Sequence, residues 1–192
     1  MKGIFPGYYI VAAGFLVQAT YLGAFFSFGI ISPELEETFD WERAQISLAS
    51  SINFVVMGCS MIFMGRLSDR FGPRLVIQIG IVIMAEGFIW FRQLNSSLTF
   101  LLSFFVISVG AGLAGFMTLT IAIVKWFERR RATAHGEMTT GLAVGGLLVP
   151  ILVVSRDEFG WRDTAFASGI LVLVVGIPIS LIMRTAPEDH GY

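Results

Sequence analysis

The sequence predicts an all-α membrane protein with six transmembrane helices, arranged as two inverted repeats of three helices each. Three observations lead to this fold class. The 192-residue chain has a mean hydropathy of +0.77 and only 14% charged residues, against roughly 25% in a typical soluble domain. Six apolar segments follow one another along the chain, and a polar motif in one connector recurs further on in a weakened form.

Each apolar segment has about the length that a helix needs to cross the hydrocarbon core, roughly 17–25 residues. The first segment is too long for the apolar part of a signal peptide, and no small-residue cleavage site follows it, so we expect it to remain as a helix. The predicted helices form one domain over residues 1–192 and cover residues 8–31, 44–64, 75–91, 98–124, 136–154 and 164–183.

Basic residues sort the connectors onto two sides of the membrane. With the N-terminus inside, the inner side collects nine of them, and the outer side has four: Arg43, Arg92, Arg156 and Arg162. Because cytoplasmic loops are enriched in Lys and Arg, both termini are predicted to be cytoplasmic. We expect a plasma membrane, such as the inner membrane of a bacterium or an archaeon. The nine inner residues are Lys2, Arg66, Arg70, Arg74, Lys125, Arg129, Arg130, Arg131 and Arg184.

The recurring motif defines the repeat. The connector at Asp69–Arg74 (DRFGPR) returns at Asp157–Arg162 (DEFGWR). The two stretches join equivalent helices of two three-helix units, yet they fall on opposite sides of the membrane. This is the pattern of a 3+3 inverted-topology repeat.

Composition also limits the function classes. The net charge of −1 gives no reason to expect a nucleic-acid partner. The single cysteine, Cys59, lies inside an apolar segment, so neither a disulfide framework nor a cysteine metal site is expected. We find no metal-ligand cluster and no nucleophile–base pair, and therefore expect no cofactor and no enzyme. We expect the protein to lie in the lipid bilayer.

Two stretches resemble the major facilitator superfamily. Gly65, Leu67, Asp69, Arg70, Gly72 and Arg74 match the G-x-L-x-D-R-x-G-x-[RK] loop that joins the second and third helices of that family. The Trp126–Arg131 stretch, with Gly136 and Gly141, is similar to a signature of its monocarboxylate-transporter branch, which includes oxalate/formate exchangers. The resemblance covers the whole chain as the amino-terminal six-helix half of a twelve-helix carrier.

The resemblance implies a secondary transporter that moves a small organic solute, a monocarboxylate in that branch, by alternating access. It assigns a cytoplasmic gate to Gly65, Asp69, Arg70, Gly72 and Arg74, in which Asp69 faces a helix N-terminus of a second bundle. The positive end of the helix dipole would favour a carboxylate there. It also assigns a cytoplasmic basic signature, although membrane topology and lipid headgroups alone would account for its arginines. That signature comprises Lys125, Arg129, Arg130, Arg131, Gly136 and Gly141.

Polar side chains within the spans are candidates for the solute cavity. Glu86 is the only acidic residue inside the apolar part of a span; it is a candidate for ion coupling, with a buried pair or a snorkelling side chain as alternatives. We expect Glu137 to act as a structural cap or an ion-pair partner near a helix start. The apolar segments contain no Lys or Arg to balance a carboxylate, which leaves the solute open. The candidate cavity residues are Gln18, Tyr21, Asn53, Phe116, Thr118, Thr139 and Thr140.

A six-helix half needs a second bundle to enclose a site. A second copy of the chain in a parallel homodimer could supply it, as could a separate carboxy-terminal half. Two alternatives from other classes remain: a carrier fragment that is inactive alone, and a non-transporting membrane protein with a binding or scaffold role.

Overall fold

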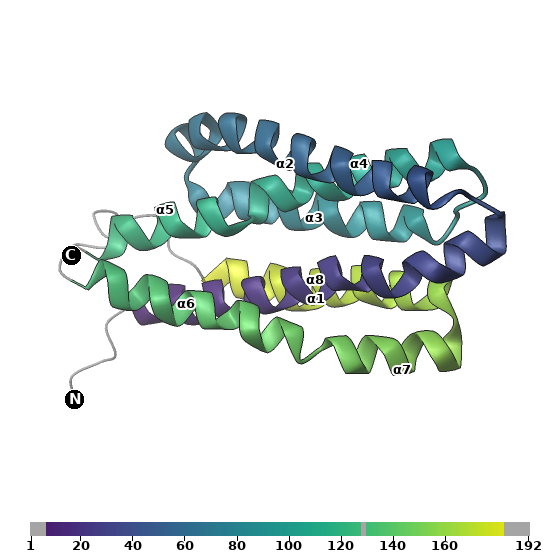
Figure 1. Cartoon of the computed structure of the whole chain (residues 1–192). Helices are drawn as coiled ribbons and strands as arrows, with labels where there is room; N and C mark the ends of the chain where they lie inside the picture. Colours follow the sequence, from purple (N-terminus) through teal and green to yellow (C-terminus); the bar gives the residue numbers. More distant parts are fainter. Residues whose placement is uncertain (1–6, 128–129, 183–192) are drawn as a thin grey trace.

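The computed structural model describes residues 7–127 and 130–182, and the side chains of residues 7–10, 20–28, 125 and 182 lie outside this description. All regular structure in these ranges is helical, which confirms the predicted all-α class. The helices run along a common direction as an elongated bundle (Figure 1). They are α1 (Gly7–Phe39), α2 (Arg43–Phe71), α3 (Pro73–Phe91), α4 (Ser97–Ala114), α5 (Phe116–Trp126), α6 (Arg131–Gly146), α7 (Val149–Phe159) and α8 (Trp161–Ile182).

Five helical stretches of the described chain are long and apolar enough to cross a membrane. They are Arg43–Phe71, Pro73–Phe91, Ser97–Val124, Arg131–Phe159 and Trp161–Leu181. The 33-residue α1 has the length for a further crossing, about 50 Å at 1.5 Å per residue. A total of six crossings stays a prediction.

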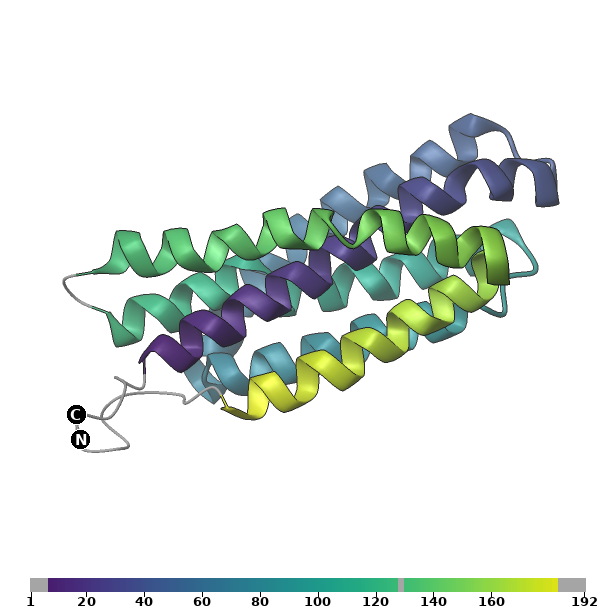
Figure 2. The same ribbon diagram turned by 90° about the horizontal axis from the view of Figure 1, so that it is seen from below.

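The connections alternate between the two ends of the bundle (Figure 1). The start of α1, the α2–α3 turn, the junction between α5 and α6, and the end of α8 lie at one end, which we call the motif end. The α1–α2, α3–α4 and α7–α8 connections lie at the opposite end. Figure 2 shows α3 and α8 along one side of the bundle and α6–α7 along the other, with α1 between them.

Two of the predicted spans are each divided into two helices. The span predicted over 98–124 breaks at Gly115, whose backbone is extended, before α5 begins at Phe116. The span predicted over 136–154 breaks at Leu147–Leu148, directly before Pro150 in the first turn of α7. A proline lacks the N–H that would continue the helix, and its ring clashes with the carbonyl four residues earlier.

Small residues bring the helices into backbone contact, as expected for helices that pack in lipid. A Cβ added at Gly80 of α3 would lie 2.5 Å from the backbone nitrogen of Ala114 and 2.8 Å from the carbonyl oxygen of Gly110 on α4. One added at Gly169 of α8 would lie 2.9 Å from Cβ of Phe88 on α3. The main apolar core forms around these crossings and includes Ile77, Ile81, Leu119, Ile123 and Met138.

Aromatic rings and arginines fasten the end of the bundle opposite the motif end. Phe91 packs against Phe100, Phe104 and Trp161 at centroid distances of 5.8–6.0 Å. Arg92 forms an ion pair with Asp163 at 3.0 Å. Arg156 forms an ion pair with Glu34 at 3.3 Å and donates through Nη1 to the Ile30 carbonyl at 2.9 Å. Arg162 donates to the Leu94 carbonyl at 2.9 Å, so these three arginines connect helices and loops of the bundle.

The α2–α3 and α7–α8 turns have the same backbone geometry. Gly72 has φ 81° and ψ 152°, and Gly160 has φ 81° and ψ 164°. Each donates its N–H to the carbonyl four residues earlier, at 3.0 Å to Ser68 and 2.8 Å to Arg156. Both lie in the left-handed φ region, which favours glycine. The two stretches that match in sequence thus form one kind of turn at opposite ends of the bundle.

Candidate functional site

The motif at the α2–α3 turn places its charges on the surface. Gly65, Asp69 and Arg70 belong to the last two turns of α2, Gly72 forms the turn, and Arg74 lies in the first turn of α3. Asp69 and Arg70 are exposed, and Arg74 is half-buried. The turn therefore presents an acidic and a basic side chain at the end of α2.

Asp69 has no partner among the described residues of the bundle. In the residues that the structure describes, no ion pair or hydrogen bond involves its carboxylate, while the Arg70 guanidinium lies 5.3 Å from the centroid of the adjacent Phe71 ring. The neighbouring Ser68 is fully buried, and its hydroxyl lacks a partner. Asp69 is free to accept hydrogen bonds from a group outside this bundle.

The basic signature is only partly described. Arg129 and the side chain of Lys125 lie outside the described residues. Arg130 and Arg131 are exposed, and Arg131 Nε donates to the Phe127 carbonyl at 2.7 Å, which holds the start of α6. Gly136 is exposed with open space around it, whereas Gly141 is buried where α6 crosses the backbone of Phe15 on α1.

Three of the polar cavity candidates are buried inside the bundle. Asn53 donates to Ser108 Oγ at 2.8 Å and links α2 to α4. Thr118 donates to the Leu113 carbonyl across the helix break at Gly115. Gln18 is buried, and its amide nitrogen lacks a partner. These three residues lie in the packed interior and not on an open wall; the side chain of Tyr21 lies outside the described residues.

A second group of candidates joins α5 to α6. Phe116 packs edge-on against the His135 ring at a centroid distance of 4.9 Å. His135 Nε2 lies 3.1 Å from Thr120 Oγ1, and Thr139 donates its hydroxyl to the His135 carbonyl. This group connects α5 to α6 at the motif end of the bundle.

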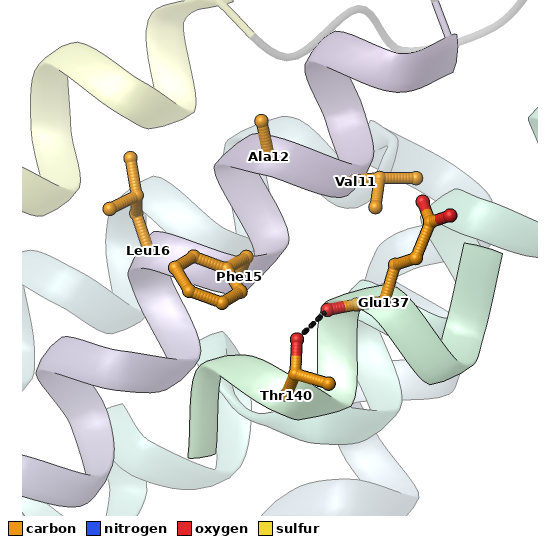
Figure 3. Close-up of a pocket in the computed structure, with 6 residues that line it drawn as sticks. All are labelled: Val11, Ala12, Phe15, Leu16, Glu137 and Thr140. Atoms are coloured by element: carbon orange, nitrogen blue, oxygen red, sulfur yellow. Dashed lines mark hydrogen bonds between the residues drawn. The ribbon is translucent and has the colours of Figure 1, made fainter. Parts of the chain in front are cut away.

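A pocket lined by described residues lies between α1 and α6, with a volume of about 490 Å³. This falls within the range of about 300–1,000 Å³ for small-molecule sites. Glu137 and Thr140 of α6 line it together with four residues of α1, all drawn as sticks in Figure 3: Val11, Ala12, Phe15 and Leu16. Thr140 was among the cavity candidates. The four α1 residues were not, because an apolar side chain in an apolar span carries no distinguishing signal in one sequence.

Glu137 does not form the expected cap. The prediction placed the start of this helix near Gly136, but α6 begins at Arg131, so Glu137 lies in its second turn. Alanine and arginine have high helix propensity, so the polar stretch before the apolar segment continues the helix. In the described part of the chain the Glu137 carboxylate has no hydrogen bond and no ion pair; only its backbone carbonyl accepts a bond, from Thr140 at 2.6 Å.

Glu86 lies away from this pocket. It belongs to an exposed stripe of α3 that also carries large apolar residues: Leu75, Ile79, Val82 and Trp90. Helix α3 packs mainly against α4 and α8, whereas the pocket lies between α1 and α6. The structure therefore does not bring Glu86 together with the other cavity candidates.

Among the described residues, no group of three or more His, Cys, Asp or Glu side chains is placed to hold a metal ion. The pocket offers one carboxylate and one hydroxyl, and the charged α2–α3 turn lies at the same end of the bundle.

Comparison with known proteins points to one protein family. The model of the Major Facilitator Superfamily matches residues 14–191. Monocarboxylate transporter 11 of Homo sapiens is 30% identical over 87% of this chain and 36% of its own length. A probable hexose phosphate transport protein of Chlamydia trachomatis is 27% identical, with coverages of 86% and 36%. An MFS-type transporter of Gibberella moniliformis is 26% identical, with coverages of 91% and 44%. The chain thus spans less than half the length of these curated relatives.

Proposed function

Because the chain belongs to the Major Facilitator Superfamily, we propose that it forms one six-helix bundle of a secondary transporter that moves a small organic solute by alternating access. The bundle is built from two inverted three-helix repeats, and a second bundle completes the solute site. The matching turns at Gly72 and Gly160, on opposite ends of the bundle, support the inverted repeat.

The observation that carries the proposal is the uneven burial of the helices. In their most apolar windows, 22% of α2 and 17% of the α6–α7 stretch are buried inside the bundle, against 61% of the α4–α5 stretch. Few residues of these two spans are therefore buried within this bundle, and we infer that they contact something outside it.

The exposed surfaces of α2 and α6–α7 mix small or polar residues with large apolar ones. On α2 the exposed small or polar residues are Ser47, Ser51, Gly58 and Cys59, and the exposed large apolar residues are Leu48, Phe54, Val55, Ile62, Phe63 and Phe71. On α6 the residues Thr133, Gly136, Thr140 and Ala143 are exposed, and on α7 the apolar Ile151, Val154 and Phe159. Small and polar residues are typical of helix–helix interfaces and water-filled cavities in membranes. We infer that α2 and α6–α7 face the second bundle.

The charged turn then acts as a gate contact. Asp69 of one bundle meets a helix start of the other, where exposed N–H groups and the helix dipole favour a carboxylate. In a parallel homodimer this start is the first turn of α6 at Arg131, ahead of the exposed Gly136 in the second turn. A separate carboxy-terminal half would offer an equivalent helix. Either arrangement closes the motif end, which we place on the cytoplasmic side of a plasma membrane.

Substitution Asp69→Asn tests the proposal. The change removes the charge but keeps the size, so the outward-open state loses a closing contact. We expect a smaller dimer fraction in detergent, or greater accessibility of a cysteine placed at Thr140 in a Cys59→Ser background.

Asp157→Asn, the repeat-related change at the opposite end, serves as the control; it removes the ion pair with Arg156 at 2.6 Å but no contact at the motif end, and is expected to alter neither quantity. If Asp69→Asn leaves both the dimer fraction and the accessibility at the wild-type level, the gate assignment is wrong. If the accessibility of this cysteine is the same in every variant, the result would favour a non-transporting scaffold role.

A further inference from the structure

The α1–α6 pocket has an acidic character. Of its six described lining residues, Glu137 is the only charged one. Helix α1 contains no Lys or Arg over its whole length, and the only basic residue of α6 other than its histidine is Arg131. Arg131 lies six positions before Glu137, about 9 Å along the helix axis, and its Nε is committed to the Phe127 carbonyl. Among the described lining residues, the carboxylate of Glu137 therefore has no counter-charge.

The hydrogen-bonding groups of the pocket are acceptors. An ionised glutamate offers two acceptor oxygens and no donor. The Thr140 hydroxyl donates its single proton to the Glu137 carbonyl at 2.6 Å, so only its lone pairs remain for a ligand. The other lining side chains, Val11, Ala12, Phe15 and Leu16, have no polar atoms. A ligand with hydrogen-bond donors can pair with these acceptors, whereas a ligand that has only acceptors cannot.

We propose that this pocket binds a small organic cation, an ammonium group on an apolar body. The ammonium donates to the Glu137 carboxylate and to Thr140 Oγ1, and the apolar body contacts the four α1 side chains. The half-buried Phe15 ring adds an aromatic face, to which cations are attracted. This inference rests on the proposed function and names the class of solute that would bind at the exposed face of α6.

The proposal departs from the monocarboxylate that the family resemblance implies. A carboxylate solute would bring a second negative charge beside Glu137 and would find no donor among the described lining side chains. Like charges placed together in a partly dehydrated pocket repel each other strongly. The acidic wall therefore selects against anions.

The test compares two ligands of similar shape and opposite charge, 2-phenylethylammonium and 3-phenylpropanoate, by thermal unfolding and calorimetric titration of the purified chain in detergent. We expect the ammonium to stabilise and bind the protein, and the carboxylate to do neither. Glu137→Gln should weaken ammonium binding roughly tenfold or more, because a hydrogen bond to a charged group is lost. Thr140→Val should weaken it about fivefold.

Glu86→Gln is the matched control, since it makes the same chemical change on the α3 stripe, and binding should stay at the wild-type value. Three outcomes would overturn the proposal: carboxylate binding at least as tight as that of the ammonium, unchanged ammonium binding by Glu137→Gln, or no binding of either ion at millimolar concentrations. If cation binding fails while Asp69→Asn still changes accessibility, only the solute class is wrong. If cation binding depends on Glu137 but the accessibility of the cysteine at position 140 never changes, the proposed binding site is correct and the proposed transport is wrong.

Discussion

The crossing of α1 and α6 at Gly141 gives the sharpest test of the packing. A Cβ placed on Gly141 would overlap the carbonyl oxygen and the backbone carbons of Phe15, and a backbone cannot move aside as a flexible side chain can. We expect Gly141→Ala to separate the two helices and to destabilise the protein. Gly136→Ala is the control, because it lies on the same helix and a Cβ there meets nothing within 4 Å.

Both substitutions gain about 1 kcal/mol of helix propensity, so the difference between them isolates the steric cost. Overpacking costs about 1–3 kcal/mol, and Gly141→Ala should be less stable than Gly136→Ala by that amount. At about 2–4 °C per kcal/mol for a chain of this size, the gap is readily measured by thermal unfolding in detergent, followed by tryptophan fluorescence. A Gly141→Ala protein that melts at or above the temperature of Gly136→Ala would refute the close crossing.

Two further predictions concern the turns and the end of the bundle opposite the motif end. Gly72→Ala and Gly160→Ala should each lower the free energy of unfolding by about 1–2 kcal/mol, because alanine is strained at a φ of 81°; a loss at only one of the two turns would contradict their equivalence. Arg156→Gln should lower the melting temperature slightly, since it releases the Ile30 carbonyl and Glu34 from a partly exposed contact. Hydrogen exchange should then rise in the last turns of α1, and unchanged exchange there would argue against the contact.

The sequence allowed the class and the polar motif to be predicted, because both depend on local properties. Length and apolarity identify a membrane span, and the motif at Asp69–Arg74 needs only its residue order. Helix continuity depends on finer signals. Pro150 explains one break, and its position after two glycines was a signal that could have been used. Gly115 explains the other less directly, since glycine also occurs within unbroken membrane helices.

The candidate site was harder to predict, because burial depends on how helices face one another. Asn53 and Thr118 are polar and lie in spans, as a cavity residue would, but the packing of α4 encloses both. Phe15 shows the reverse case: it is apolar, and only the α1–α6 crossing places it at the pocket. Glu137 was assigned to a helix start because the apolar segment begins there, while the helix itself starts earlier.

The distribution of charge partners bears on how the protein is assembled. At the end of the bundle opposite the motif end, Arg92 and Arg156 each pair with an acidic residue of the bundle. At the motif end the described structure gives Asp69 no ion pair, and that residue stands exposed at the tip of the poorly buried α2. An unpaired carboxylate beside a membrane is costly unless water or a partner satisfies it. A partner that binds Asp69 would therefore add a contact at the motif end that the described residues do not supply.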